Sequence, residues 1–233
     1  MRVAPNALAL PEPSTLNVEP STSTLNLEPE PQSPLVRTGG WLFKRRTWLP
    51  QPIILAIVLI PATRMPAALM AAGALLVVLG EFIRLWGVSH IGMISRTRSD
   101  RLGPLVSTGP FGLVRNPLYL GNLGIWAGFA ISANMLWLVP GIVLLVGLEY
   151  HAIVRWEEAL LESRLGESYR DYMRRVPRWI PAFARATAGR PAATETTARP
   201  TFSLRATLFS ERGTLMAIAA GYVLLFLKAR GSP

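Results

Sequence analysis

Five apolar runs restrict the fold of this chain more than any other feature. About 20 consecutive apolar residues are needed to carry a helix across the hydrocarbon core of a bilayer. Residues 66–88 and 135–154 meet that length, 117–133 come close to it, and 50–62 and 214–227 are shorter. We predict a tight turn around Asn134 between 117–133 and 135–154. The short runs fit tilted helices, helices with interfacial flanks, or helices lying in the interface. We predict an all-α fold: a polytopic integral membrane helical bundle with four to five transmembrane helices and a cytoplasmic C-terminal helical segment.

The composition also indicates a membrane protein, and it excludes several kinds of active site. Of the 233 residues, 50% are hydrophobic and 16% are charged, whereas about a quarter of the residues in a soluble domain are charged. Cysteine is absent, which excludes disulfides, thiolate zinc sites and a cysteine nucleophile. His90 and His151 are the only histidines. A three-histidine centre is therefore impossible within one chain, and we predict no metal site.

The 24 basic residues exceed the 14 acidic ones by ten, and their distribution orients the chain. They gather at residues 44–46, 96–115 and 155–190. The positive-inside rule then places the N-terminus, the 89–116 loop and the 155–213 segment in the cytoplasm. Lys228 and Arg230 would lie outside, which weighs against the last run as a full span. Because topology explains the basic residues, and no soluble platform with interleaved aromatic residues accompanies them, we predict no nucleic-acid binding.

The ends of the chain differ in composition from its apolar middle. The N-terminal part is rich in Pro, Ser, Thr and Glu and repeats a proline-ended pentamer at 16–20 and 25–29. Such a segment cannot build a core, and it lacks the pattern of a signal peptide. We predict a disordered tail over 1–40, a membrane domain over 41–183, a flexible linker over 184–212 and a hydrophobic helix over 213–233.

The segment from Gly109 to Asn122 is the first that could carry chemistry. Asn116 is a preferred helix N-cap and Pro117 a preferred first helical residue. Three glycines of the following helix lie on one face, where small residues let another helix approach closely: Gly121, Gly124 and Gly128. The alternative is a ligand site, in which the helix N-terminus and Arg115 bind an anion and the glycines admit a ligand.

Charged residues on two other predicted helices are the remaining candidates. Arg155 and Glu158 are spaced i, i+3 on a helix that leaves the bilayer, which predicts a local ion pair worth a few tenths of a kcal/mol. The adjacent Glu157 and Glu158 could instead bind a cationic ligand. Glu81 and Arg84 lie deep in an apolar run, where charged groups are costly. Their spacing also predicts a mutual ion pair, with a functional role as the alternative.

Taken together, the two segments and the helical hairpin between them resemble a family of membrane methyltransferases. This is the superfamily of isoprenylcysteine carboxyl methyltransferase and phosphatidylethanolamine (PEMT-like phospholipid) N-methyltransferase. The family pattern is roughly G-P-[YF]-x-x-[VF]-R-[HN]-P-x-Y-x-G, then R-x-E-E, L-x-x-x-[FL]-G-x-x-Y-x-x-Y and V-P-x-x-x-P. The resemblance covers about residues 66–183. It is carried by Gly109, Pro110, Arg115, Pro117, Tyr119, Gly121, Arg155, Glu157, Glu158, Gly166, Tyr169, Tyr172, Val176, Pro177 and Pro181.

The resemblance implies S-adenosylmethionine as methyl donor, bound on the cytoplasmic side. It implies that Glu157 or Glu158 takes the cofactor's amino group. Arg115 and Arg155 would orient the acceptor's carboxylate or phosphate, and Glu158 joins them in the implied catalytic set. The implied cofactor-binding set is Gly109, Asn116, Pro117, Tyr119, Gly121, Glu157 and Glu158. Methyl transfer needs no protein nucleophile, so the lack of cysteine is compatible with it.

The implied acceptor is a membrane lipid or isoprenoid, and the chemistry leaves alternatives. Carboxyl O-methylation of a prenylcysteine-like substrate is favoured through the C-terminal element, with N-methylation of a phospholipid amine as the second choice. Sterol reductases that use NADPH share part of the pattern, and a non-catalytic membrane adaptor is a further alternative. Asn116 stands where many family members have His, which argues against an imidazole base there. The chain beyond Pro181 has no role assigned by the family.

Overall fold

The computed structural model describes residues 33–46, 51–60, 66–91, 105–180 and 203–231, and the regular elements among these residues are helices, with no strand. The helices are α1 (Pro34–Arg45), α2 (Gln51–Leu59), α3 (Ala67–Ile91), the 3-10 helix η2 (Gly109–Gly112), α4 (Pro117–Ser132), α5 (Leu138–Leu165), α6 (Glu167–Arg175) and α7 (Leu204–Gly231). The predicted all-α class is confirmed.

Three of these helices, α3, α5 and α7, are long and apolar enough to cross a membrane. Helix α4 has 16 residues and α2 has nine. At 1.5 Å per residue, α4 is roughly 24 Å long, less than the hydrocarbon core of about 30 Å. The membrane helical bundle is confirmed, with three helices of spanning length where the sequence predicted four to five. The last apolar run, expected to be short, is the core of a 28-residue helix.

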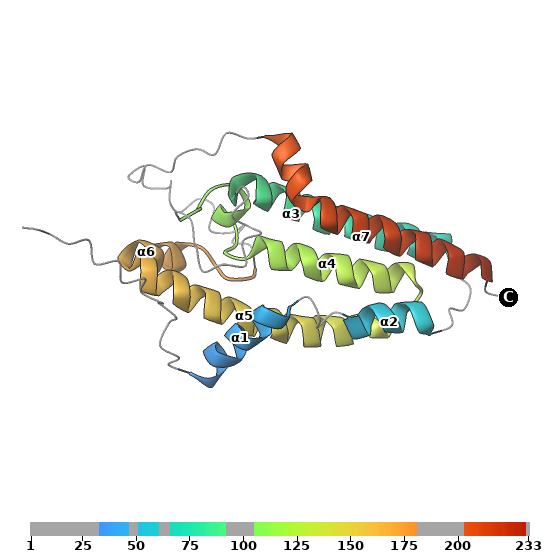
Figure 1. Ribbon diagram of the computed structural model, residues 1–233, viewed down its shortest axis with the longest axis horizontal. Coiled ribbons are helices and arrows are strands. Elements are labelled where there is room, and N and C mark those ends of the chain that lie inside the picture. The colour runs from blue at the N-terminus through green and yellow to red at the C-terminus, as the bar shows by residue number, and fades with distance from the viewer. Residues whose placement is uncertain (1–32, 47–50, 61–65, 92–104, 181–202, 232–233) are drawn as a thin grey trace, which may run out of the picture.

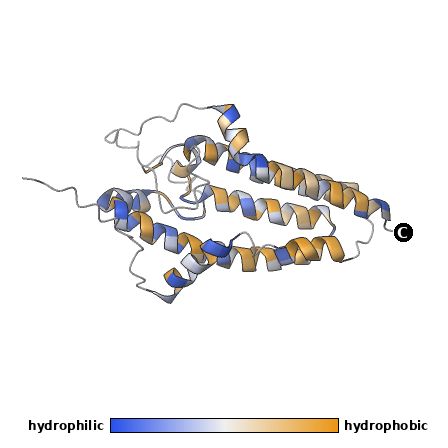
Figure 2. Ribbon diagram, in the orientation of Figure 1, coloured by the Kyte–Doolittle hydropathy of each residue, from blue (hydrophilic) through white to orange (hydrophobic). Residues whose placement is uncertain are grey.

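The long helices run side by side along the molecule, with α6 at one end (Figure 1). Hydrophobic residues cover most of α3, α4, α5 and α7, whereas hydrophilic ones gather around α6 (Figure 2). Large apolar side chains point outward from α3 and α5, among them Leu75, Val78, Phe82, Leu145 and Leu148. Such an apolar exterior is the surface that lipid covers in a membrane bundle.

Glycines bring α3 and α4 into close contact along their whole length. A Cβ atom at Gly80 would lie 2.6 Å from the carbonyl oxygen of Gly121. Further along, a Cβ atom at Gly128 would lie 2.7 Å from the carbonyl oxygen of Gly73. Small residues at such crossings let two backbones approach in a bilayer. The predicted role of the α4 glycines in helix packing is therefore confirmed.

A tight turn at Asn134 joins α4 to α5, as the sequence predicts. Asn134 has a φ of 58°, in the left-handed region that asparagine tolerates better than most residues. The amide of Met135 donates to the carbonyl of Ala130 at 2.8 Å. This turn ends α4 after 16 residues and returns α5 alongside it, so that both helices contribute to the same end of the bundle.

Helix α1 occupies residues that the composition assigned to the disordered tail. The Ser33 side chain accepts a bond from the amide of Val36 at 3.4 Å, and Pro34 stands at the first helical position. Both are N-terminal signals that the Pro- and Glu-rich surroundings obscured. The tail boundary at residue 40 is thus wrong for residues 34–40, while residues 1–32 lie outside the described part. Helix α1 packs on α5, and the rings of Phe43 and Trp156 are 4.8 Å apart.

Helix α7 begins at Leu204, inside the stretch predicted to be a linker, and a buried ionic contact joins it to α3. Arg84 Nη2 lies 2.5 Å from Glu211 Oε2, and the same nitrogen donates to Thr214 Oγ1 at 3.1 Å. Arg84 Nη1 donates to Asn122 of α4 at 2.5 Å. Arg84 therefore ties α3, α4 and α7 together.

The predicted pair of Glu81 and Arg84 is formed, with Oε2 and Nε 3.3 Å apart. Glu81 is buried and Arg84 is partly buried, and the arginine has one carboxylate on its own helix and a second one from α7. At the other end of α7, Lys228 donates to the carbonyl of Ile57 near the C-terminus of α2. The carbonyls of the last turn of a helix have no amide partner within that helix, and Lys228 supplies a donor to one of them in α2.

We expect Gly80→Val to destabilise the bundle, because its Cβ atom would meet the backbone of α4. Overpacking of this kind costs about 1–3 kcal/mol or more. Thermal unfolding in detergent, followed by circular dichroism, would show a lower midpoint. Gly147→Val is the control, since nothing lies within 4 Å of a Cβ atom there. Equal midpoints for the two variants would contradict the packing role of the α3–α4 contact.

We expect Glu211→Ala to weaken the attachment of α7, because it removes the buried carboxylate that pairs with Arg84. Breaking a buried pair costs about 3–5 kcal/mol, which thermal unfolding would detect. Glu162→Ala is the control, since Glu162 forms an exposed pair with Arg170 at 2.8 Å and exposed pairs contribute little. An unfolding midpoint in Glu211→Ala as high as in the control would show that this contact does not hold α7.

Candidate active site

The chain after α6 folds back onto the start of α4. The backbone amide of Arg115 donates to the carbonyl of Pro177 at 2.9 Å. The side chain of Asn116 donates to the carbonyl of Arg178 at 3.3 Å. Helix α6 ends at the extended Val176, the conformation favoured before a proline. These contacts fix residues 176–180 against the first segment identified in the sequence.

Two buried tyrosines hold α6 against η2. The hydroxyl of Tyr172 donates to the carbonyl of Phe111 at 2.8 Å, and the rings of Tyr169 and Tyr172 are 5.8 Å apart. Burial raises the pKa of both phenols above their ordinary range. The two tyrosines of the sequence pattern therefore have a clear packing role.

The carboxylate of Glu158 is the centre of this end of the bundle. Arg178 Nε donates to its two oxygens at 3.0 and 3.1 Å, and Arg178 Nη2 donates to Oε2 at 2.6 Å. Arg115 Nε lies 3.4 Å from Oε1. Glu158 is 6% exposed, and its hydrogen bonds hold the pKa of Arg178 above its usual value. Two guanidinium groups therefore neutralise one buried carboxylate.

Arg155 does not take part in this cluster, contrary to the local ion pair predicted from its spacing. Its side chain is exposed, and Glu158 is bound by Arg115 and Arg178 instead. The bidentate contact explains the outcome, because it is stronger than a solvent-exposed i, i+3 pair. Arg155 is thus exposed and forms no ion pair with Glu158, the carboxylate of the predicted catalytic set.

The neighbouring Glu157 has a different environment. Its Oε1 accepts a hydrogen bond from the hydroxyl of Tyr119 at 2.9 Å, and the Tyr119 ring packs on Tyr150 at 4.8 Å. Within the described ranges, the Glu157 carboxylate forms no close ion pair, although the charge of Arg46 acts on it. One glutamate of the pair is therefore neutralised by arginines, while the other has a single hydroxyl donor.

The other predicted cofactor-binding residues divide between this cluster and the helix packing. Asn116 stands at the N-cap of α4, but its side chain makes no capping bond and binds Arg178 instead. Pro117 is fully buried at the first helical position. Gly109 has a φ of 60° and lies against the ring of His90. Gly121 faces Gly80 within the α3–α4 contact, away from the Glu157–Glu158 cluster.

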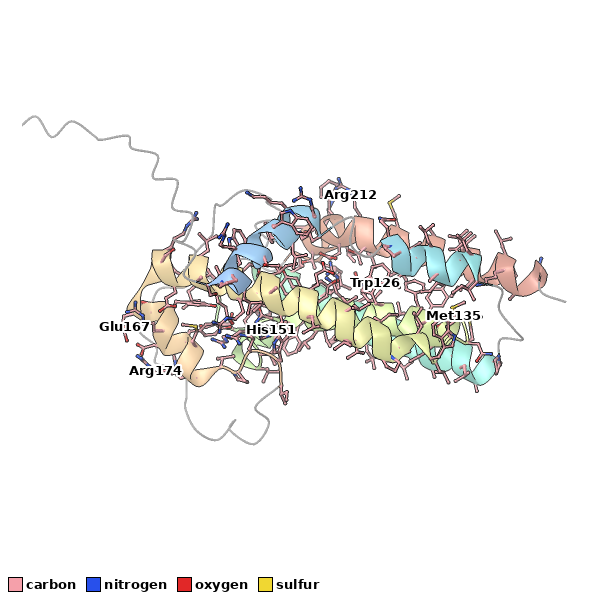
Figure 3. The ribbon with its side chains drawn as sticks, turned by 90° about the horizontal axis from the view of Figure 1, so that it is seen from below. Trp126, Met135, His151, Glu167, Arg174 and Arg212 are labelled. Atoms are coloured by element: carbon pink, nitrogen blue, oxygen red, sulfur yellow. The ribbon has the colours of Figure 1, made fainter. Side chains whose placement is uncertain are left out.

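Arg178 is the residue of this site that sequence reasoning missed. It occupies a variable position of the V-P-x-x-x-P element, in which the pattern specifies only the valine and the two prolines. The next residue, Trp179, donates from its indole nitrogen to Nδ1 of His151 on α5 at 3.3 Å. In Figure 3, His151 lies between the end marked by Glu167 and Arg174 and the middle of the bundle marked by Trp126. The described residues contain no group of three or more His, Cys, Asp or Glu side chains that could hold a metal ion.

Comparisons with known proteins agree with the resemblance seen in the sequence. Residues 68–168 match the family model of phospholipid methyltransferases, which confirms the resemblance over that segment. The match covers α3 to the start of α6 and contains Arg115, Glu157 and Glu158. Arg178 and α7 lie beyond it.

Two curated relatives match about half of the chain. The nickel-cobalt-cadmium resistance protein NccN of Alcaligenes xylosoxydans xylosoxydans is 33% identical over 119 residues, which are 51% of this chain and 53% of the relative. The cobalt-zinc-cadmium resistance protein CzcN of Cupriavidus metallidurans is 32% identical over 113 residues, 48% of this chain and 49% of the relative. The matched part thus spans about half the length of these relatives. No solved structure matches the chain.

We expect Arg178→Ala to destabilise the protein, because it leaves the buried Glu158 with one arginine at 3.4 Å. The loss of a buried partner corresponds to about 3 kcal/mol, measurable by thermal unfolding. Arg155→Ala is the matched control, since it removes an exposed arginine from the same region. If Arg155→Ala lowered the midpoint as much as Arg178→Ala, the assignment of Arg178 as the main partner of Glu158 would be wrong.

Proposed function

We propose that this protein is an S-adenosylmethionine-dependent methyltransferase that acts on a membrane-embedded acceptor. The observation that carries the proposal is the difference between the two adjacent glutamates. Glu158 is neutralised by Arg178 and Arg115. Glu157 has the Tyr119 hydroxyl as its hydrogen-bond donor. A carboxylate with free acceptor capacity is suited to bind the amino group of the cofactor.

The residues present fit S-adenosylmethionine. Glu157 would hold the ammonium group, and Tyr119 would orient Glu157 through its hydroxyl. The backbone near Gly109 and Asn116 would line the rest of the molecule. When bound, S-adenosylmethionine supplies a methyl group on a sulfonium sulfur, which an oxygen or nitrogen lone pair can take without a protein nucleophile. The chain's lack of cysteine is compatible with that chemistry.

The other residues would act by positioning and by excluding water. The contacts of Glu158 with Arg115 and Arg178 hold α4, α5 and the 176–180 segment in fixed relation. Fixed relative placement of donor and acceptor can contribute several kcal/mol to catalysis. Arg115 also brings positive charge to the site, which suits an anionic acceptor group. Glu158 and Arg178 are thus positioning residues in this proposal.

We favour a carboxylate acceptor on a prenylcysteine-like or related isoprenoid lipid, methylated on oxygen. N-methylation of a phospholipid amine is the second candidate, and the description of the matching family as phospholipid methyltransferases supports it. The names of the two relatives refer to metal resistance and specify no acceptor. We place the site on the cytoplasmic side, in line with the basic residues around it, where a soluble cofactor can reach it.

We expect the purified protein in detergent to bind S-adenosylmethionine, and Glu157→Gln to weaken that binding about 10- to 100-fold. This range follows from the 1.5–3 kcal/mol that a hydrogen bond to a charged group contributes. Isothermal titration calorimetry measures it, with Arg155→Gln as control because Arg155 is exposed. NADPH in place of S-adenosylmethionine tests the reductase alternative.

Binding of S-adenosylmethionine to a folded sample that Glu157→Gln does not weaken would overturn the role of Glu157. No binding by the folded wild type would overturn the proposed function itself. Binding of NADPH instead would favour reduction. After cofactor binding is established, transfer of a labelled methyl group to N-acetyl-S-farnesylcysteine or to phosphatidylethanolamine distinguishes the two acceptor classes.

A further inference from the structure

A cavity of about 580 Å³ lies between α2, α4, α5 and α7. This volume is within the range of about 300–1,000 Å³ of small-ligand sites. Apolar and aromatic side chains line most of it, among them Ile54, Ile125, Trp126, Phe129 and Leu224. A chamber of this kind within a membrane bundle suits an apolar ligand that enters from the lipid.

Helix α7 forms one wall of this chamber, although it lies beyond the segment that matches the methyltransferase family. Its lining residues extend from Gly213 to Lys228, roughly 22 Å at 1.5 Å per residue. Several of these residues have small side chains that leave space in the chamber: Gly213, Ala217, Ala220 and Gly221. The chamber is therefore long enough for an extended hydrocarbon chain.

One end of the chamber adjoins the proposed cofactor site. Tyr150 lines the chamber, and its ring packs at 4.8 Å against Tyr119, whose hydroxyl donates to Glu157. Arg46 also lines the chamber, and its guanidinium stacks on Phe43 at 4.0 Å. Within the described part of the chain, no carboxylate forms a close ion pair with Arg46, although its charge interacts with that of Glu157. Its guanidinium therefore keeps hydrogen-bond donors for an anionic group that arrives with the ligand.

The polar residues elsewhere on the wall have partners within the protein. Asn122 and Thr214 line the chamber and both bind Arg84. Lys228, at the end of the α7 lining, binds the carbonyl of Ile57. The chamber thus has an apolar body between Arg46, which lies near Glu157, and Lys228, which is bound to a backbone carbonyl. The Arg46 end is complementary to the headgroup of an anionic amphiphile.

We propose that α7 is a substrate-binding wall, and that the chamber holds the hydrocarbon chain of a lipid whose anionic headgroup lies at Arg46. The identification of this lipid with the methyl acceptor rests on the proposed function. It adds that acceptor choice depends on a helix outside the family-matching segment. Ala217 and Ala220, one turn apart on α7, would then determine which chains fit.

Photolabelling of the full chain in lipid nanodiscs tests this directly, and its readout does not require methyl transfer. The probe is palmitic acid with a diazirine at its terminal carbon, and its methyl ester tests the headgroup charge. We expect mass spectrometry to find the label on residues that line the chamber. We expect Ala217→Phe and Ala220→Phe to lower labelling about tenfold or more, as an occluded pocket contact does.

Ala219→Phe is the matched control, because Ala219 is exposed on the same helix and does not line the chamber. Its labelling should equal that of the wild type. Arg46→Gln should weaken labelling by the acid and leave labelling by the ester unchanged. Competition with N-acetyl-S-farnesylcysteine or with phosphatidylethanolamine distinguishes an isoprenoid occupant from a phospholipid.

Equal labelling of Ala217→Phe, Ala220→Phe and Ala219→Phe would overturn the inference, as would labels confined to the outer faces of the helices. A thermal unfolding midpoint and S-adenosylmethionine titration of each variant separate this result from failure of the proposed function. If the cofactor binds and the chamber is not labelled, this inference alone fails. If the chamber is labelled as expected and no cofactor binds, the lipid chamber stands and the methyltransferase proposal fails.

Discussion

A buried carboxylate destabilises a helical bundle unless positive charge lies close to it, and Glu158 meets this requirement with residues from two other parts of the chain. Arg115 comes from the start of α4, and Arg178 from the segment that follows α6. The same segments also join through backbone contacts at Pro177 and Arg178. The charge of one glutamate therefore holds together α4, α5 and the 176–180 segment at the proposed cofactor site.

The two adjacent glutamates are divided by helix geometry. Consecutive residues of a helix point about 100° apart, so Glu157 and Glu158 reach different neighbours. Glu158 meets two arginines, while Glu157 meets Tyr119 at the start of α4. An adjacent pair can thus give one carboxylate to structure and keep the other for a ligand, which a single glutamate could not do. The adjacent pair is therefore a stronger indication of a ligand site than either glutamate alone.

The parts of the structure that sequence predicts are those encoded by local spacing. The α4 glycines, the turn at Asn134 and the pair of Glu81 and Arg84 all follow from residues close together in the chain. Glu211 and Arg178 were not predicted, because their partners are 127 and 20 residues away. Their positions depend on how α7 and the chain after α6 return to the bundle. For Arg155, the local spacing predicted a pair, and the stronger tertiary contact of Arg178 replaced it.

The division between the family-matching segment and the rest of the chain has a physical meaning. Residues 68–168 contain the close α3–α4 contact and both glutamates, so they supply the packed helices that support the site and its two carboxylates. The elements outside that segment complete the site and the chamber. Arg178 pairs with the carboxylate of Glu158. Arg46, at the end of α1, and residues of α7 line the chamber. A bilayer stabilises helix association mainly through packing and polar contacts. A further helix that packs on these helices therefore needs a specific polar contact, and the ion pair of Glu211 with Arg84 provides it for α7. The small residues of α7 remain free to line the chamber.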